Sequence, residues 1–411
     1  MLGVEHTVIE SVDLEPDGRG GEQLIARVRP KAGVASRCSR CSRCQQRCPG
    51  YDTASEPRRW RGLDCGTTPV YLQAVSHRVS CVEHGVVVAA VPWARPGSRF
   101  TTAFEDTAVW LVCHATLSVV AVLLRIAWRS VAAIVTRVVA ERAGQTDRLA
   151  GLRRIGIDEI SYRKGQRYLL VVVDHDTGRV VWAGKDRTTA TLQRFFQDLG
   201  SQRSRALTHV SADGAEWIHT VVTERAPQAV LCLDAFHVVA WATKALDQVR
   251  RRLGVQLRGA GQHEAAAELK NTRWALLKNP PNQSGNQRTT VAGIAWTNKP
   301  LYTAYLLKEQ LRAIFETKGS VGRALLAGWI SWARRCRIPE FVTLAQTLTR
   351  YRTLILNTLD HALSTARVEA TNTHLRLLTR RSYGFHSPES LIAIANLTRG
   401  GLCPPLPGRT A

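Results

Sequence analysis

The chain has 411 residues, of which 45% are apolar and 22% charged, and this ordinary globular composition excludes collagen-like, coiled-coil and largely disordered proteins. At roughly 100–200 residues per domain, the length allows two to four domains. Lysine and arginine number 56 against 33 acidic residues, which gives a formal net charge of +23. Chains with such an excess most often bind nucleic acid, so we expect DNA to be a partner.

No stretch of the sequence reaches the roughly 18 consecutive apolar residues of a membrane-spanning helix. The first residues also lack the basic start and apolar run of a signal peptide. We therefore expect a cytoplasmic protein with no membrane partner. In that reducing compartment the ten cysteines are not expected to form disulfides.

The N-terminal 98 residues predict a short β-hairpin followed by a zinc-binding module. Residues 1–35 alternate weakly between apolar and polar side chains, as in a hairpin. Further on, Cys41 and Cys44 form a C-x-x-C pair, and Cys81 and His84 form a C-x-x-H pair. Two such pairs supply the four ligands of a closed tetrahedral zinc site, which is structural rather than catalytic. The choice of ligands stays open because three more cysteines lie in the same region: Cys38, Cys48 and Cys65.

Residues 99–143 contain few helix breakers and predict helices, two of which resemble a helix-turn-helix. Ser118 is expected to cap the first helix, and Ser130 lies near the start of the second. Arg125 stands in the turn, at a position where glycine is common. Three residues fall at the offsets where this motif buries one small and two branched side chains: Ala121, Val131 and Ile134.

In a helix-turn-helix of this kind, Trp128, Arg129 and Arg137 would face outward and contact DNA. The alternative interpretation is an ordinary amphipathic helix pair that packs between domains. The net positive charge of the chain favours DNA binding.

From residue 152 onward the sequence changes to short apolar runs separated by turns. Three of these runs predict an antiparallel meander, and two further strands alternate with helices, so we expect a mixed α/β sheet. The expected strands are 155–161, 168–174, 179–183, 206–211 and 229–233, and the expected helices are 188–199 and 215–225. From residue 238 to about residue 365 the chain is helical, and a last helix begins near Arg367.

Three carboxylates stand out in this part of the chain. Asp158 lies inside the first strand, where a buried acid is costly without a partner or a metal. Asp213 directly follows the fourth strand, at the carboxyl end where open α/β sheets place active sites, and Glu369 opens the last helix. Three such carboxylates can hold two magnesium ions, which promote phosphodiester chemistry. Spacing alone does not show that they converge, because aspartates after strands are also common turn caps.

Several motifs along the chain occur together, in the same order, in one family. They are Cys41-x-x-Cys44-x-x-x-Cys48, Arg58-Arg59-Trp60, Cys81-x-x-His84-Gly85, Gly156-Ile157-Asp158-Glu159, Asp213-Gly214, Asp234-Ala235-Phe236-His237, Val368-Glu369-Ala370-x-Asn372 and Tyr383-Gly384-Phe385. With these motifs, from about residue 38 to residue 388, the sequence resembles the DDE transposases of bacterial insertion sequences, specifically the ISL3 family.

The resemblance implies an α/β fold: an RNase H-like mixed sheet interrupted by an all-helical insertion and preceded by the zinc-binding module and the helix-turn-helix. It implies Asp158, Asp213 and Glu369 as the catalytic, metal-binding triad. Asp234 and His237 match an accessory D-x-x-H motif that assists the active site, and Asp234 is the reserve candidate for the second metal ligand. The implied regions are a hairpin and zinc module (1–98), a helix-turn-helix segment (99–143), the first part of the catalytic core (152–237), the helical insertion (238–365), the last helix of the core (366–400) and a disordered tail (401–411).

The implied function is that of a DNA transposase that binds the ends of its insertion sequence, cleaves them and joins the 3′ ends to target DNA. The implied cofactors are two magnesium or manganese ions and one structural zinc. Arg376 and Arg380 follow Glu369 on one helix face and are expected to hold phosphates, unless that face is simply solvated. Bringing two ends together requires a dimer or larger assembly on DNA. The alternatives are an RNase H-like nuclease without strand joining and a catalytically inactive DNA-binding regulator.

Overall fold

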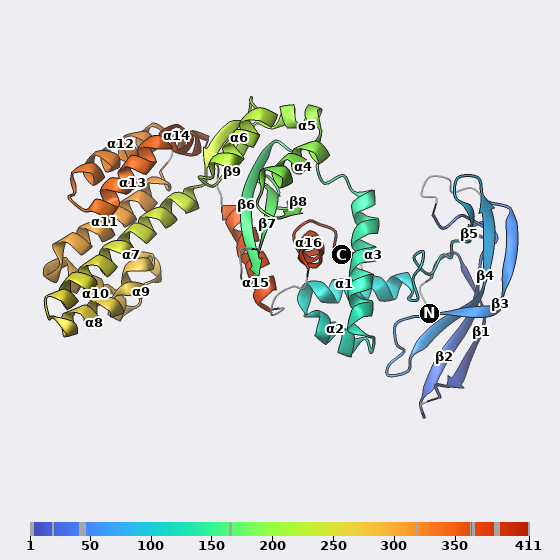
Figure 1. Cartoon of the computed structure of the whole chain (residues 1–411). Coiled ribbons are helices and arrows are strands. Elements are labelled where there is room, and N and C mark those ends of the chain that lie inside the picture. The colour runs from blue at the N-terminus through green and yellow to red at the C-terminus, as the bar shows by residue number, and fades with distance from the viewer. Residues whose placement is uncertain are drawn as a thin grey trace. The chain divides into compact units, whose positions relative to one another are not determined.

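The computed structural model describes residues 4–18, 20–40, 47–163, 167–317, 319–361, 363, 366–381 and 387–409. Contacts between residues divide the chain into two compact units (Figure 1). The first unit comprises Met1–Thr146 together with Ala393–Ala411, and the second comprises Asp147–Ile392.

A five-stranded sheet dominates the first unit. Its strands are β1 Thr7–Pro16, β2 Glu22–Pro30, β3 Gly50–Arg61, β4 Val70–Cys81 and β5 Gly85–Val88. The predicted hairpin is present, because β1 and β2 pair antiparallel. β4 pairs with β2, β3 and β5, and only its pairing with β2 is parallel. The sequence did not predict β3, since this strand is exposed along most of its length and shows no apolar alternation.

Three helices follow the sheet, α1 Thr102–His114, α2 Leu117–Leu123 and α3 Trp128–Gln145. The axes of α2 and α3 are bent by 108°. The prediction that Ser118 caps α2 was wrong: Thr116 precedes the helix and its side chain accepts the N–H of Val119. Arg125 in the turn has φ of +53°, the left-handed conformation that explains why glycine is common at this position. The three residues predicted to be buried in this motif are buried: Ala121, Val131 and Ile134.

The second unit contains a five-stranded mixed sheet in the order β10-β9-β6-β7-β8. Its strands are β6 Arg154–Arg163, β7 Arg167–Asp174, β8 Val180–Lys185, β9 His209–Ala212 and β10 Val230–Leu233. β6, β7 and β8 form the predicted antiparallel meander. β9 joins the sheet beside β6 in parallel, and β10 continues in parallel beside β9. The mixed α/β architecture that the sequence predicted is therefore present.

The two faces of this sheet are covered by different helices. Ile155 and Ile157 of β6 belong to a core with α4 Thr189–Leu199 and α6 Glu216–Arg225. The short helix α5 Ser201–Ala206 links α4 to β9. Gly156 lies between these two residues and therefore points to the opposite face of the sheet. There it meets α15 Ala366–Arg381, which Figure 1 shows running along β6.

Helices between β10 and α15 form a separate hydrophobic cluster in the same unit. They are α7 Ala235–Gly259, α8 His263–Asn271, α9 Arg273–Leu277, the 3-10 turn η1 Pro280–Asn282, α10 Gly285–Thr297, α11 Lys299–Ile314, α12 Gly319–Arg335, α13 Pro339–Arg350 and α14 Arg352–His361. The chain returns to the sheet through α14, where Thr358 donates to the carbonyl of Leu233 at 2.6 Å and Asn357 donates to the carbonyl of Leu231 at 2.8 Å.

The last helix, α16 Pro388–Thr398, is followed by an irregular segment. The prediction of a disordered tail was wrong for the start of this segment, because Leu402 is 1% exposed and Sγ of Cys403 lies 3.5 Å from Sγ of Cys113. Leu402 and Pro404 are both buried, although the Pro-rich composition of this segment favoured disorder. Within the described residues no single helix is long and apolar enough to span a membrane, although the bent pair of α2 and α3 reaches that length and hydropathy when taken together.

Candidate active site and metal centre

Asp213 and Asp234 directly follow the parallel strands β9 and β10, and Asp158 lies in the middle of the adjoining strand β6. On β6 and β9, Gly156 lies opposite Ser211. Two residues further along these strands come Asp158 and Asp213. On the next strand, β10, Asp234 directly follows the last paired residue. Asp158 and Asp213 therefore each lie two residues past this pair, and Asp213 falls just beyond the last residue of β9.

Asp158 is buried in β6 and held by three neighbours. Its Oδ1 accepts the backbone N–H of Glu159 at 2.7 Å, and its Oδ2 accepts a hydrogen bond from Nδ2 of Asn372 on α15. Nε2 of His237 lies 3.9 Å from the same Oδ1. Both Asp158 oxygens are therefore oriented, one by the backbone of its own strand and the other by the helix on this face of the sheet.

The carboxyls of this site influence one another. Burial raises the pKa of Asp158 to about 6; Asp234 adds to this rise, whereas His237 and Arg376 oppose it. Burial also raises the pKa of Glu369, with Asp234 again raising it and Arg376 lowering it. Because the charges of Asp234 and Arg376 shift the pKa values of both Asp158 and Glu369, these two carboxyls share one electrostatic environment.

Asp213 also acts as a turn cap, the alternative considered from the sequence. Its Oδ1 accepts the N–H of Ala215 at 3.0 Å, and its backbone carbonyl accepts a hydrogen bond from Nε2 of His219 at 2.7 Å. The side chain is half-buried. Burial raises the pKa of Glu159, and the charge of Asp213 raises it further. Asp213 is thus close to the residue that follows Asp158.

The D-x-x-H segment lies where α7 begins. Asp234 is the N-cap of this helix, and its Oδ1 accepts the N–H of Phe236 at 2.9 Å. His237 follows in the first turn, which directs its ring to Asp158. The same cap therefore fixes the start of α7 and the position of both residues of the motif.

α15 packs closely on β6 and carries Glu369. A Cβ atom at Gly156 would lie 2.7 Å from Cγ2 of Val368, so only glycine permits this approach. One turn further, Thr371 donates to the carbonyl of Gly178 at 3.1 Å. These contacts fix the first turns of α15, and they therefore fix the backbone position of Glu369, which follows Val368.

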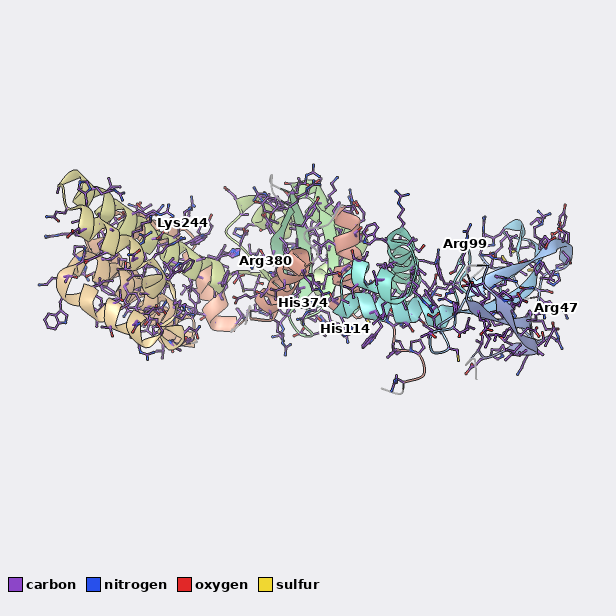
Figure 2. All side chains as sticks on the ribbon, turned by 90° about the horizontal axis from the view of Figure 1, so that it is seen from below. Arg47, Arg99, His114, Lys244, His374 and Arg380 are labelled. Atoms are coloured by element: carbon purple, nitrogen blue, oxygen red, sulfur yellow. The ribbon has the colours of Figure 1, made fainter. Side chains whose placement is uncertain are left out.

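Arg376 and Arg380 are exposed on α15, and Figure 2 labels Arg380 on this helix. Arg376 is near enough to the acids for its charge to lower the pKa of both Asp158 and Glu369. An exposed guanidinium in this position can meet a phosphate brought to the carboxylates.

A second group of ligand atoms lies in the N-terminal sheet. Sγ of Cys38, Sγ of Cys81 and Nδ1 of His84 all lie within 4.8 Å of one another, and no other described group of three His, Cys, Asp or Glu residues meets this criterion. The Nδ1 atom is 3.8 Å from the first sulfur and 3.6 Å from the second. Tetrahedral zinc separates sulfur and nitrogen ligands by ~3.6 Å, so this donor set fits zinc. Cys41 and Cys44, the predicted first pair, lie outside the described residues.

The cysteine cluster is also electrostatically suited to a cation. A hydrogen bond with His84 is the main cause that lowers the pKa of Cys81 to about 6, and Cys38 contributes. Thiolates are the form of cysteine that binds metal. Cys48 is buried beside this cluster but is not among its mutually close ligand atoms.

The residues predicted to face DNA from the helix-turn-helix differ in their surroundings. Trp128 is 43% exposed and Arg129 is exposed at the start of α3. Arg137 instead forms an ion pair with the fully buried Glu105 of α1. This placement argues against Arg137 as a DNA contact, because its guanidinium is committed to a buried carboxylate.

Sequence reasoning missed the network around Glu105. This carboxylate also accepts hydrogen bonds from Oγ of Ser98 at 2.6 Å and from Nη1 of the buried Arg95 at 3.3 Å. Arg95 is bonded in addition to Asp106 at 2.7 Å and to Glu141 at 2.6 Å. No local sequence pattern reveals it, since Arg137 and Glu141 join it from α3, 32 and 46 positions after their partners Glu105 and Arg95.

Sequence reasoning also gave Asn372 no role, although the residue belongs to a quoted motif. It is 2% exposed, and its Oδ1 has no hydrogen-bond partner among the described residues. The available signal was its spacing, because a residue three places after Glu369 lies on the same helix face.

Comparisons with known proteins agree with this arrangement of modules. Residues 38–84 match the zinc finger of the transposases of IS204, IS1001, IS1096 and IS1165, and residues 89–139 match the helix-turn-helix domain of transposase family ISL3. Residues 155–395, more than half of the chain, match the DDE transposase family of the ISL3 group. The chain belongs to the ISL3 family of transposases.

Two relatives of this ISL3 transposase illustrate the range of similarity. The transposase for insertion sequence element IS1557 of Mycobacterium tuberculosis is 50% identical over 430 aligned positions, which cover 100% of this chain and 96% of the relative. The transposase for IS1001 of Bordetella parapertussis is 28% identical over 335 positions, covering 81% of this chain and 82% of the relative. The chain is therefore a DNA transposase of the DDE type, with a zinc-ribbon region and a DNA-binding helix-turn-helix.

Proposed function

We propose that this transposase cleaves the ends of its insertion sequence and joins the 3′ ends to target DNA, with Asp158, Asp213 and Glu369 as the catalytic metal ligands. The observation that carries the proposal is the position of Asp158 in β6 and of Asp213 and Asp234 directly after the adjacent parallel strands β9 and β10, with the helix that bears Glu369 packed on β6. The strand order, three antiparallel strands with two parallel strands beside the first, supports an RNase H-like sheet, with the helices between β10 and α15 as its insertion.

Two divalent ions, magnesium or manganese, would supply Lewis acids on both sides of the scissile phosphate. The chain's own residues then have positioning roles. Asn372 and the backbone N–H of Glu159 fix the two oxygens of Asp158. Asp234 and His237 support the site from the start of α7, and Arg376 and Arg380 hold the phosphate backbone.

The decisive assay mixes the purified transposase with labelled DNA carrying the element ends, target DNA and magnesium. Joined product is the expected result. Cleavage without joining would instead indicate a nuclease, and binding alone an inactive regulator. Asp158→Asn and Glu369→Gln should each lower cleavage at least a hundredfold. The matched control is Glu224→Gln, an exposed carboxylate on α6 at the opposite face of the sheet, which should leave the rate unchanged.

A parallel pair of variants decides the second ligand. If Asp213 binds metal, Asp213→Asn raises the manganese concentration needed for half-maximal cleavage, and Asp234→Asn raises it less. The reverse order would transfer the role to Asp234, the reserve candidate. Joining also requires two ends in one complex, so we propose a dimer or larger assembly on DNA, which mass measurements with and without end DNA would detect.

We further propose one structural zinc held by Cys38, Cys81 and His84, with a fourth ligand from Cys41 or Cys44. The mutual distances of the first three support this set. Metal analysis should find about one equivalent of zinc, and less than half an equivalent would contradict the proposal. Cys38→Ser should release the metal, whereas the exposed Cys65, which is outside the cluster, should tolerate the same change.

A further inference from the structure

Two cysteines that the proposed function does not use meet in the first unit. Cys113 stands at the end of α1, beside His114, which Figure 2 labels, and Cys403 follows α16 in the C-terminal segment. The thiol of Cys113 donates to the sulfur of Cys403 at 3.5 Å, although the two residues are 290 positions apart in the sequence. Both residues belong to the same compact unit, so the fold of that unit brings the two thiols into contact.

This pair differs from the described cysteines of the second unit. Cys113 and Cys403 are both partly exposed, so a small oxidant can reach them. Cys232, in contrast, is buried, and burial raises the pKa of its thiol to about 12. Cys336 is partly exposed, but its sulfur lies against the carbonyl of Ile338 at 3.9 Å rather than against a second thiol.

The surroundings of Cys403 favour its thiolate. The hydrogen bond from Cys113 is the main cause that lowers the pKa of Cys403, and the charge of Arg142 lowers it further, whereas burial and Asp106 oppose the shift. Asp106 is itself paired with Arg95 at 2.7 Å. The thiolate is the nucleophilic form of cysteine. Cys403 is therefore suited to react first, and Cys113 is in place as the second, resolving thiol.

The backbone around Cys403 allows the two sulfurs to approach. Residues 399–409 belong to no helix or strand, and Gly401 has φ of +76°. A disulfide bond is about 2 Å long, so the sulfurs must approach by about 1.5 Å. A segment of irregular backbone can make this small movement while the buried Leu402 keeps it on the first unit.

We propose that Cys113 and Cys403 are a site of reversible oxidation by hydroperoxides, at which a disulfide ties the C-terminal segment to α1. With hydrogen peroxide, the Cys403 thiolate attacks one oxygen and breaks the O–O bond, which gives a sulfenic acid on Cys403 and one water. The Cys113 thiol then loses its proton and attacks the sulfenic sulfur, and the displaced hydroxide leaves with that proton as a second water. The two thiols lose two electrons and two protons, and the peroxide takes them up.

The disulfide would close a loop that contains α2, α3 and the whole second unit, Asp147–Ile392. The sequence leaves the first unit before this unit and returns to it afterwards, so the new bond makes the return covalent. Closing so long a loop removes much of the conformational freedom of the unfolded chain. Disulfides in a reducing compartment are transient and respond to the redox state, so the oxidised form is expected to be reversible.

The experiment treats the reduced full chain with one equivalent of hydrogen peroxide, blocks the remaining thiols and maps the tryptic peptides. Trypsin releases Cys113 in peptide 100–125 and Cys403 in peptide 400–409, and each peptide contains one cysteine. The expected product is a monomer in which these two peptides are linked, about 2 Da lighter than the reduced chain. Dithiothreitol should reverse the link, and the zinc content should not change.

Single variants separate the roles of the two thiols. Cys113→Ser should leave a sulfenic acid on Cys403 that dimedone captures, whereas Cys403→Ser should lower dimedone labelling of Cys113 about tenfold below that level. The matched control is Cys336→Ser, a partly exposed cysteine outside the pair, which should form the linked peptide as the wild type does. The melting temperature of each reduced variant establishes that it is folded.

Oxidation should also raise the melting temperature of the wild type by about 4 °C or more, and of neither single variant of the pair. A linked chain that melts with the reduced chain would refute the anchoring of the C-terminal segment. The absence of the linked peptide would overturn the proposal. A disulfide between two chains, or loss of zinc before the linked peptide appears, would overturn it as well, because the pair would then not be the preferred site of oxidation.

Discussion

Replacing Asn372 with leucine tests whether this side chain positions Asp158. The change removes the hydrogen bond donated to Oδ2 of Asp158 and keeps a similar volume. Asn372 is 2% exposed and Asp158 9% exposed, so water does not readily replace the donor. A hydrogen bond to a charged acceptor contributes about 1.5–3 kcal/mol, which corresponds to about a 10- to 100-fold weaker affinity of the site for divalent metal.

The assay is a manganese titration of the full-length protein, read both as end cleavage and as the metal-induced rise in melting temperature. Thr371→Val is the matched control, because this neighbouring buried side chain also loses a hydrogen bond on α15, to Gly178, but does not touch Asp158. The half-saturating manganese concentration should rise about 10- to 100-fold in Asn372→Leu and by less than threefold in the control. Equal shifts in both variants would refute the positioning role and leave only a general effect on α15.

Three further outcomes are expected. Gly156→Ala should push Val368 away from β6 and lower the cleavage rate at least tenfold without weakening DNA binding. A second change, Val368→Ala, should restore part of the rate. If it does not, the close packing of Gly156 on Val368 is not the cause of the loss. Burial raises the pKa of Asp158 from 3.8 to about 6, so the protonated carboxyl stabilises the fold at low pH and this stability is lost as the pH rises through about 6. Asp158→Asn should therefore raise the melting temperature of metal-free protein at pH 7.5, and this gain should shrink toward pH 4. Glu105→Ala should cost about 3 kcal/mol in urea unfolding, because it breaks a buried network and removes the carboxylate partner of Arg137 while Arg95 keeps Asp106 and Glu141. Glu10→Gln at an exposed pair should cost under about 1 kcal/mol.

Local patterns in the sequence were sufficient to predict the strands of the sheet in the second unit. Short apolar runs and the turn at residues 174–178 predict the meander of β6, β7 and β8, which the structure contains. Position after a strand marks Asp213 as a candidate, and the parallel pairing of Gly156 with Ser211 places Asp213 and Asp158 two residues past the same pair. Local propensity could do this because each strand is short, apolar and bounded by turn residues.

Long-range pairings could not be predicted in this way. The ion pair of Arg137 with Glu105 joins α3 to α1, and the periodicity of α3 alone says only that Arg137 is beside the buried stripe. The same holds for Cys38, whose sulfur lies within 4.8 Å of the sulfur of Cys81, although the sequence left open which of the clustered cysteines bind zinc. Asn372 was visible as a motif residue, but its partner lies on a strand more than 200 positions earlier.

The aspartates of the proposed site precede the long helical insertion, whereas Glu369 and Asn372 follow it on α15. A ribosome therefore releases the zinc-binding and helix-turn-helix segments well before it completes a centre able to cut. Under the proposed function, a gene copy that has lost its 3′ portion would encode a product that binds the element ends but cannot cleave them. Truncated copies of such an element would then restrain the intact copies in the same cell.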